Sequence, residues 1–277
     1  MTNIHIVKAD GTREPFEASK LHGSLISAGS KEVLAQEIVQ HIENELKDGM
    51  STSEIYKHAF FLLRKKQRRA AIKYSLRSAV MELGPSGFPF EKFVAEIFTS
   101  KGYQTKTGEI VMGQCVAHEV DVVAWNENKL IMVEAKFHNS ANFKSDLKVA
   151  LYVKARFDDL RDTKHTSYGK TRSLDEMWLV TNTKFSSTAI HYAECKGLKL
   201  VGWNYPEKGS LQDLIDDGGV HPVTCLTALS KHQKNSLIAQ NIILCRQLID
   251  NTEALKNFGF SDQKINKTLE DIALLSQ

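Results

Sequence analysis

The sequence predicts a multi-domain α/β protein, in which a mostly helical N-terminal part and a small helical C-terminal module flank a central part of alternating strands and helices. Three observations lead to this prediction. The chain has 277 residues, which is more than one domain usually contains. Before residue 84 and after residue 222, apolar residues recur at three- and four-residue intervals, which indicates helices. Between these limits short apolar strands alternate with helical segments, which is typical of an α/β layer.

The composition is that of an ordinary globular protein. Hydrophobic residues make up 42% and charged residues 25% of the chain, which argues against the disordered, fibrous and membrane classes. The net charge of +3 neither requires nor excludes a polyanionic partner. No segment reaches the roughly 18 apolar residues that a membrane span needs, and the cysteines are too scattered for a disulfide framework or a zinc ribbon. We therefore expect a cytoplasmic protein with no membrane partner.

A β-hairpin followed by helices is predicted for the N-terminal part. Residues 4–7 and 13–16 are short strand-like runs on either side of a turn. Helical periodicity then runs over residues 17–82, and breaks at 29–30 and 48–51 divide it into separate helices.

Two local signals mark the ends of elements in this region. After the second break, Thr52 or Ser53 is expected to cap a new helix, and Glu54 favours its positive N-terminal end. Two glycines and a proline in residues 84–87 discourage helix on either side, so we place a domain boundary there.

The central part alternates between the two kinds of element. Its predicted elements are, in order, a helix over 88–101, a strand hairpin over 118–139, a helix over 143–160, a strand over 176–181, a helix over 186–196 and a strand over 198–202. The first helix is amphipathic, so its phenylalanines are expected in the core. After residue 222 the strands stop, and periodicity over 226–249 and 261–275 predicts the helical C-terminal module.

The predicted hairpin, HEVDVVAWNENKLIMVEAKFHN, places ionisable residues among valines and methionines, where charge is costly unless it is paired or bound to a metal. If Glu127 and Asn128 form the centre of an even-numbered turn, Asp121 falls opposite Glu134 across the antiparallel pair. Lys136 then shares this face, because alternate residues of a strand point the same way. A three-residue loop would instead move Asp121 to the other face.

Two close carboxylates and a lysine suit metal-assisted hydrolysis of a phosphodiester. Asp121 and Glu134 would repel each other unless a cation lay between them, and oxygen ligands of this kind suit Mg²⁺ or Mn²⁺. Lys136 could orient or help deprotonate a metal-bound water and stabilise charge on a phosphate. The alternative interpretation is a sheet whose polar residues simply face water.

The order and spacing of these residues resemble the PD-(D/E)XK nuclease signature, in which twelve residues separate Asp121 from Glu134-Ala135-Lys136. The closer resemblance is to Mrr-type restriction endonuclease domains, and it also rests on Phe90-Glu91-Lys92-Phe93 and His118-Glu119-Val120-Asp121. It spans about residues 88–205. The resemblance implies an α/β/α domain with a mixed sheet that cleaves DNA.

The same resemblance implies a role for each residue of the site. Asp121 and Glu134 would bind Mg²⁺ or Mn²⁺, and the Ala135 carbonyl would complete the metal site. Lys136 would serve the attacking water. Glu91 would be a further acid, supplied by the first helix of the domain.

A second site is indicated near the N-terminus. The run IVKADGTREPFEASK combines a turn of small residues with Lys8, Arg13 and Lys20, and fixed cations pair well with phosphate oxygens. Together with TSEI at residues 52–55, its order and spacing resemble the ATP-cone, a nucleotide-sensing module. The alternative is a small helical domain with charged turns.

The ATP-cone resemblance covers about residues 3–83 and implies a helical bundle that is capped by the hairpin and binds ATP or dATP. Lys8, Glu14, Lys20 and Thr52 match the nucleotide-contacting positions of that family. Because the chain has no Walker motif, we expect the nucleotide to be an effector and not a consumed substrate.

Several further charged residues lie near the two predicted sites or in helices next to them. Glu96 is the less favoured alternative to Glu91 as the acid of the first helix. Residues 64–73 contain six cations, which form either a solvated helix face or a surface for DNA phosphates. Lys154 and Arg156 are interpreted as exposed helix charges, with contact to the DNA backbone as the less favoured alternative. His138 is interpreted as non-catalytic.

The sequence therefore predicts three domains, an ATP-cone over 1–84, a nuclease domain over 88–205 and a helical module over 206–277. The predicted function is a Mg²⁺-dependent DNA endonuclease of the restriction or defence type, regulated by ATP or dATP and active as a homo-oligomer, a dimer. One alternative is a nucleotide-responsive DNA-binding regulator that does not cut. Another is an RNA- or structure-specific nuclease, because the phosphodiester chemistry is the same.

Overall fold

The computed structural model describes residues 4–8, 10–166 and 168–275, and these form two compact units. The N-terminal unit consists of the chain up to Leu76 together with the stretch from Asn266 onward. The central unit consists of Arg77–Ile265. The sequence predicts three domains, whereas this division has two units and groups residues 206–265 with the central one. The predicted domain limits therefore stay predictions.

The N-terminal unit is a small hairpin followed by helices, as the sequence predicts. Its elements are β1 (His5–Val7), β2 (Arg13–Pro15), α1 (Ala18–Ser27), α2 (Glu32–Glu45), α3 (Thr52–Lys66) and α4 (Arg68–Tyr74). The two strands pair antiparallel, with Ile6 opposite Glu14. Fully buried side chains such as Leu25 and Leu63 form the core between the helices.

The residue that caps α3 is Ser51, so the prediction of Thr52 or Ser53 is wrong. Ser51 Oγ accepts a hydrogen bond from the Glu54 backbone N–H at 3.2 Å, and Glu54 Oε2 accepts one from the Ser51 N–H at 2.8 Å. This reciprocal pairing requires an acceptor side chain three residues after the cap. A cap at Thr52 or Ser53 would put Ile55 or a tyrosine there, and neither can complete the pair.

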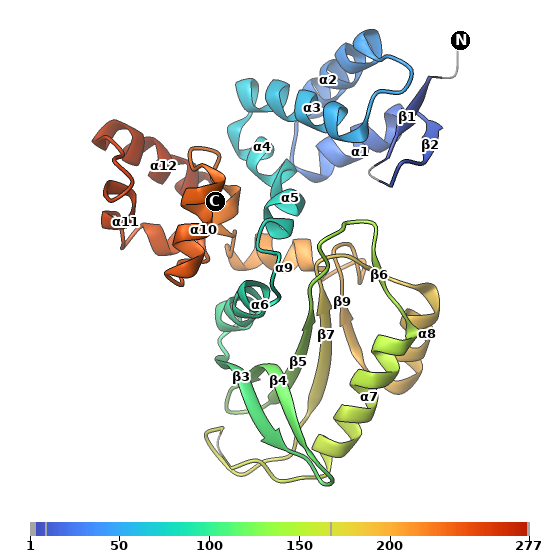
Figure 1. The fold of residues 1–277 in the computed structure, drawn as a ribbon, viewed down its shortest axis with the longest axis vertical. Coiled ribbons are helices and arrows are strands. Elements are labelled where there is room, and N and C mark those ends of the chain that lie inside the picture. The colour runs from blue at the N-terminus through green and yellow to red at the C-terminus, as the bar shows by residue number, and fades with distance from the viewer. Residues whose placement is uncertain (1–3, 9, 167, 276–277) are drawn as a thin grey trace. The chain divides into compact units, whose positions relative to one another are not determined.

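The central unit is built on a five-stranded mixed sheet with the order β3-β4-β5-β7-β9 (Figure 1). The strands are β3 (Gln104–Met112), β4 (Ala117–Trp125), β5 (Leu130–Lys136), β7 (Glu176–Thr181) and β9 (Lys199–Val201). The first three pair antiparallel and the last three pair parallel, which confirms the predicted mixed sheet. A separate two-stranded parallel sheet joins β6 (Lys144–Ser145) to β8 (Lys184–Phe185).

Helices cover both faces of the five-stranded sheet (Figure 1). They are α6 (Phe88–Ser100) on one face, and α7 (Leu147–Arg161) and α8 (Ser187–Lys196) on the other. One apolar core joins α7 and α8 to the sheet through residues such as Val153, Ala189 and Leu179. The helix predicted to start at residue 143 begins only at Leu147, because Asp146 caps it by accepting hydrogen bonds from two backbone N–H groups.

The remaining helices agree only in part with the sequence prediction, because the last one matches the helix predicted over 261–275, whereas those at 211–218 and 253–256 were not predicted. They are α5 (Leu76–Met81), α9 (Leu211–Gly218), α10 (Lys231–Ala239), α11 (Glu253–Lys256) and α12 (Asp262–Leu275). The continuous helix expected over 226–249 is wrong, since α10 ends at Ala239 and Asn241 has a φ of 62°. Asparagine tolerates that left-handed backbone, which interrupts a helix. Within the described part of the chain, every helix is too short or too polar to cross a bilayer.

Candidate active site

The β4–β5 hairpin has the register on which the predicted site depends. The paired residues are Val122 with Val133, Val123 with Met132, Ala124 with Ile131, and Trp125 with Leu130. The Asn126 N–H donates to the Lys129 carbonyl at 3.0 Å, so residues 127–128 form the centre of the turn, and the even-numbered turn is confirmed. Continuing the register by one pair puts Asp121 opposite Glu134.

Asp121 is fixed by a hydrogen bond across the hairpin. Its Oδ2 atom accepts from the Ala135 backbone N–H at 2.7 Å. Burial, together with the nearby carboxylates of Glu134 and Glu91, raises the pKa of Asp121 to about 7. A carboxylate perturbed in this way by burial and by other acids is typical of functional sites.

Glu134 pairs with Arg156, which the sequence predicted to be an exposed helix charge. Arg156, on α7, donates to Glu134 Oε2 and to the Glu119 carbonyl oxygen. The interpretation of Arg156 as an exposed helix charge is wrong, because the residue is only 7% exposed. It is also wrong for Lys154, whose side chain is 14% exposed and pairs with Asp158.

A signal for the burial of Arg156 was present in the sequence. Val153, Phe157 and Leu160 are buried residues of α7, at the spacing that places them on one face of a helix. Arg156 falls within this apolar stripe, three residues after Val153 and four before Leu160. Buried charges of this kind are normally paired, so a carboxylate partner on the sheet could have been expected.

Glu91 belongs electrostatically to the same group of acids. Burial raises its pKa, and the carboxylates of Glu119 and Glu134 add to the effect. Glu96, the alternative acid on α6, instead pairs with Arg246 at 3.0 Å. The structure therefore brings Glu91, and not Glu96, into the electrostatic neighbourhood of Glu134.

Lys136 ends β5 and is exposed. It lies two residues after Glu134 on the same strand, so both side chains leave the same face of the sheet. Its charge, together with burial as the larger cause, lowers the pKa of His138. His138 stacks on Phe143 with ring centroids 4.4 Å apart, and its Nε2 lies 2.9 Å from Ser145 Oγ. These contacts suit a structural histidine.

The carboxylates fit a divalent cation in their chemistry. Asp121 Oδ2 and Glu134 Oε2 are used by protein donors, whereas Asp121 Oδ1 and Glu134 Oε1 accept no hydrogen bond from any described residue. Hard oxygen ligands of this kind, with a backbone carbonyl from Ala135, suit Mg²⁺ or Mn²⁺. Among the described residues, Asp121, Glu134 and Glu91 do not bring one oxygen atom each within 4.8 Å of one another, so the three acids do not form a ready three-carboxylate site.

The predicted nucleotide residues gather where the hairpin meets α3. Lys8 pairs with Glu14 at 2.5 Å, and that hydrogen bond is the main cause of the lowered pKa of Glu14, to which Lys20 also contributes. The Val7 N–H donates to the Met50 carbonyl at 3.0 Å, and Val7 also bridges to Ser51. Thr52, the first residue of α3, follows directly.

The basic run of residues 64–73 lines a cavity of about 660 Å³ in the N-terminal unit. Lys66 pairs with Glu37 at 2.6 Å, and Arg68 pairs with Asp271 at 2.5 Å. The run is therefore partly neutralised by the protein itself.

Three protein families match consecutive parts of this chain. They are described as ATP cone domain over residues 4–76, Restriction endonuclease over 84–204, and AF1548-like, C-terminal over 221–276.

One protein sequence and two solved structures are also similar to this chain. An uncharacterized protein of Archaeoglobus fulgidus is 36% identical over 179 residues, which is 64% of this chain and 97% of that protein. The crystal structure of a protein of unknown function, AF1548, is also 36% identical, with a TM-score of 0.51 over 69% of this chain and 96% of that one. The MspJI restriction endonuclease in complex with a 27-mer oligonucleotide is 18% identical, with a TM-score of 0.32 over 48% of this chain and 29% of that one. The chain therefore belongs to the AF1548-like family and combines an ATP cone domain with a restriction endonuclease domain.

Proposed function

We propose that this protein is a Mg²⁺- or Mn²⁺-dependent DNA endonuclease of the restriction or defence type, regulated by ATP or dATP at its ATP cone domain. The observation that carries the proposal is the register of the β4–β5 hairpin, which aligns Asp121 with Glu134. The family match supports a nuclease. The cytoplasmic location and the homodimer expected from the sequence are part of the proposal.

The metal would be held by the free oxygens of Asp121 and Glu134 and by the Ala135 carbonyl. When bound, such an ion polarises a phosphoryl oxygen and promotes ionisation of a bound water. The protein's own contribution is to hold these ligands still. The Ala135 N–H fixes Asp121, and Arg156 fixes Glu134.

Lys136 supplies the positive charge of the proposed reaction. It is exposed at the end of β5, so a phosphate in the site can reach its ammonium group. A cation in this position stabilises the negative charge that develops on the phosphate during attack by water. Glu91 approaches from α6 as the additional acid, and its raised pKa favours a role in holding or passing a proton.

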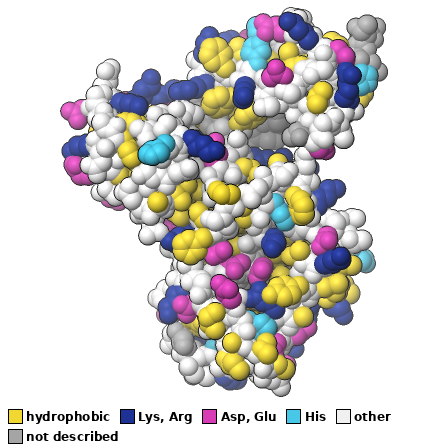
Figure 2. Space-filling model, in the orientation of Figure 1, with side chains coloured by type: hydrophobic (Ala, Val, Ile, Leu, Met, Phe, Trp, Pro, Cys, Tyr) yellow, Lys and Arg dark blue, Asp and Glu magenta, His cyan; other side chains and the backbone are white. Residues whose placement is uncertain are grey.

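DNA is the proposed substrate. Because the net charge of the chain is small, local clusters of basic residues would have to bind its phosphates. Lys, Arg, Asp and Glu side chains are intermixed over the visible face of each unit in Figure 2, in agreement with the small net charge. The basic run of residues 64–73 is the densest local source of positive charge. We expect it to contribute salt-sensitive contacts to phosphates.

The nucleotide is proposed to act as an effector through Lys8, Glu14, Lys20 and Thr52. The Lys8–Glu14 pair and the charge of Lys20 form a polar cluster beside the start of α3. Triphosphate oxygens would compete with Glu14 for Lys8, because both are anionic acceptors. Binding would therefore alter the contact between the two hairpin strands.

One observation favours a second candidate, a nucleotide-responsive DNA-binding protein that does not cut. Arg156 compensates the charge of Glu134 within the protein. A site whose acids are balanced by an arginine has less need of a metal ion. In this alternative the restriction endonuclease domain would bind DNA without hydrolysing it.

The two acids of α6 provide a matched test of the site. We would incubate the full chain with methylated plasmid, unmethylated plasmid or structured RNA, with Mg²⁺ or Mn²⁺, and with or without ATP or dATP. The proposal predicts DNA cleavage that Glu91→Gln lowers and Glu96→Gln leaves unchanged. Cleavage of RNA alone would replace DNA with RNA as the substrate. Tight DNA binding without cleavage in any condition would establish the second candidate in place of the nuclease.

A further inference from the structure

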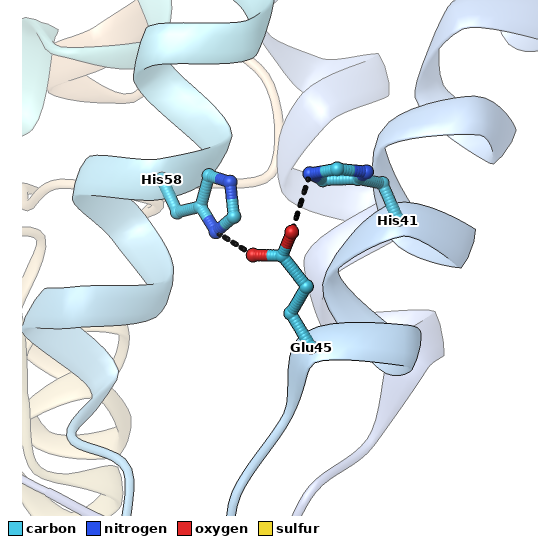
Figure 3. A group of neighbouring side chains, drawn as sticks. All are labelled: His41, Glu45 and His58. Carbon is cyan, nitrogen blue, oxygen red and sulfur yellow. Dashed lines mark ion pairs between the residues drawn. The ribbon is translucent and has the colours of Figure 1, made fainter.

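We propose that the N-terminal unit contains a second metal site, formed by His41, Glu45 and His58, which takes a borderline-soft ion such as Zn²⁺. Figure 3 shows the two imidazole rings and the carboxylate directed toward one another. Among the residues that the structure describes, this is the group of three histidine, cysteine or acidic side chains whose ligand atoms all lie within 4.8 Å of one another.

The sequence places these side chains on facing helices. His41 and Glu45 are four residues apart on α2, so they share one face of that helix. His58 lies on α3, which follows α2 in the chain. Buried residues next to them, Ile42 on α2 and Ala59 on α3, belong to one apolar core. Core packing therefore fixes the backbone positions from which the three ligands extend.

The ligand atoms are close enough to converge on one ion. One ligand atom from each of the three residues lies within 4.8 Å of the other two. His41 Nε2 lies 3.3 Å from Glu45 Oε1, and His58 Nδ1 lies 3.4 Å from Glu45 Oε2, so the two rings face different oxygens of one carboxylate. Zinc bonds to nitrogen and oxygen are about 2.0–2.2 Å long, so ligands of one tetrahedral ion are about 3.3–3.6 Å apart, and binding would draw the three atoms slightly closer together.

The same distances are poor for hydrogen bonds. Protein N–H···O bonds are typically about 2.7–3.2 Å long, which is shorter than either histidine–carboxylate distance here. The single-histidine pair of the same unit, His22 with Glu32, is closer at 3.0 Å. Convergence of three groups without good hydrogen bonds is what a shared cation explains.

The donor set selects a different metal from the one proposed for the nuclease site. Two imidazoles and one carboxylate suit Zn²⁺, and Ni²⁺ or Cu²⁺ less specifically, whereas carboxylates and a carbonyl suit Mg²⁺. The site is open to solvent, because the side chains of His41, Glu45 and His58 are 46%, 53% and 30% exposed. An ion from solution can enter, and water can fill a fourth position.

Occupancy of this site would tie α2 to α3 across the loop of residues 46–51. That loop also holds the hairpin, since the Gly49 N–H donates to the His5 carbonyl at 2.8 Å and the Val7 N–H donates to the Met50 carbonyl. A metal ion would thus stiffen the segment that joins the helices to the predicted nucleotide residues. We expect Zn²⁺ to raise the unfolding temperature of the N-terminal unit.

The test uses the full chain with Asp121→Asn, which removes the proposed nuclease metal site from the measurement. After chelator treatment, Zn²⁺ affinity is measured by competition with a chromophoric chelator, and Co²⁺ absorption reports nitrogen ligands. We expect His41→Ala, Glu45→Gln and His58→Ala each to lower Zn²⁺ affinity at least about tenfold. Residues that only hydrogen-bond to metal ligands cost about 10- to 100-fold in affinity when they are replaced, so loss of a ligand should cost no less.

His22→Ala is the matched control, because it removes a histidine that pairs with a glutamate in the same unit but has no second histidine. This variant should keep the Zn²⁺ affinity and the Co²⁺ spectrum of the Asp121→Asn parent chain, and circular dichroism checks that every variant is folded. Equal Zn²⁺ affinity in the parent chain and in the His41→Ala/His58→Ala variant would overturn the proposal. The measurement does not depend on nuclease activity, so failure of the zinc proposal and failure of the proposed function can be distinguished.

Discussion

The carboxylate of Glu134 has a protein partner on one side and a second acid on the other. Arg156 donates to it from α7, and the hairpin register places Asp121 opposite. The arginine is 7% exposed, so water screens its charge only weakly. Without this cation, two half-buried acids would face each other and would require another positive charge.

Removal of the arginine should therefore be costly to stability. We expect Arg156→Ala to lower the free energy of unfolding by about 3 kcal/mol, because it leaves a buried carboxylate without its partner. Arg161→Ala, at the exposed end of the same helix, should change it by less than about 0.5 kcal/mol. Urea unfolding with a chelator present measures both. Similar losses in the two variants would show that the Glu134 contact contributes little.

At the residue scale, the sequence predicted the pairing of the acids but not the partner of Glu134. Parity of the turn was enough to align Asp121 with Glu134, because strand geometry repeats every two residues. The position of Arg156 depends on a long-range contact between α7 and the sheet. Its apolar neighbours indicated burial, yet nothing local identified which acid it would meet.

Two elements are joined by an aspartate of α7 that lies outside the proposed site. Asp159 accepts a hydrogen bond from the Cys115 N–H at 2.7 Å, and its Oδ2 lies 2.7 Å from His118 Nε2. A side chain at Gly113 would come within 2.1 Å of the same carboxylate, so the turn between β3 and β4 passes close to α7. Asp159 thereby holds this turn against the helix.

This contact predicts an acid-sensitive component of stability. The hydrogen bond with His118 is the main cause that lowers the pKa of Asp159 to about 2. A lowered folded-state pKa stabilises the fold above the ordinary aspartate range, and that stabilisation is lost as the pH falls toward 2. Between pH 4 and pH 2, the unfolding temperature should therefore fall more steeply with decreasing pH in the wild type than in Asp159→Asn. Asp162→Asn, at the exposed end of α7, should keep the wild-type slope.

The capping box of α3 makes a second prediction at this scale. Ser51→Ala removes the acceptor for the Glu54 N–H and should lower the stability of the N-terminal unit by about 1 kcal/mol. Ser53→Ala is the matched control, because Ser53 is exposed in the first turn and makes no capping bond. Urea unfolding followed by far-UV circular dichroism distinguishes them. A larger loss in Ser53→Ala would contradict the capping assignment.

Apolar periodicity predicted several elements correctly, but it also predicted a continuous helix over 226–249, where α10 ends at Ala239. The helix that became α6 and the strand that became β7 carry clear apolar patterns. Strand β3 was not predicted, because its sequence QTKTGEIVM has few apolar residues and only one of its positions is buried. Its pairing with β4 holds it in the sheet, and that pairing is invisible to a local pattern.

The whole molecule combines two units with different ligand chemistry. The N-terminal unit offers cations and imidazoles, and the central unit offers a group of acids. This division agrees with the matches to an ATP cone domain and to a restriction endonuclease. The family resemblances in the sequence predicted the order of the two units along the chain. They did not predict that the C-terminal helices would be divided between the units at residues 265–266.

Nucleotide binding should depend on the hairpin of the N-terminal unit. Calorimetric titration of the full chain with ATP and with dATP is expected to give a saturable signal. Lys8→Ala should weaken it about tenfold, the value of one charge-assisted hydrogen bond of roughly 1.5 kcal/mol. Lys31→Ala, an exposed lysine at the start of α2, should have no effect. Absence of binding by either nucleotide would remove the effector role.

The central claim is that Asp121, Glu134 and Lys136 form a metal-dependent site for phosphodiester cleavage. The most direct measurement compares the plasmid cleavage rates of the wild type, Asp121→Asn and Lys136→Ala in Mg²⁺ or Mn²⁺ and in EDTA. Cleavage by the wild type only with a divalent metal, and a loss of roughly 100-fold or more in each variant, is the predicted result. Metal-dependent cleavage that survives both substitutions would contradict the account.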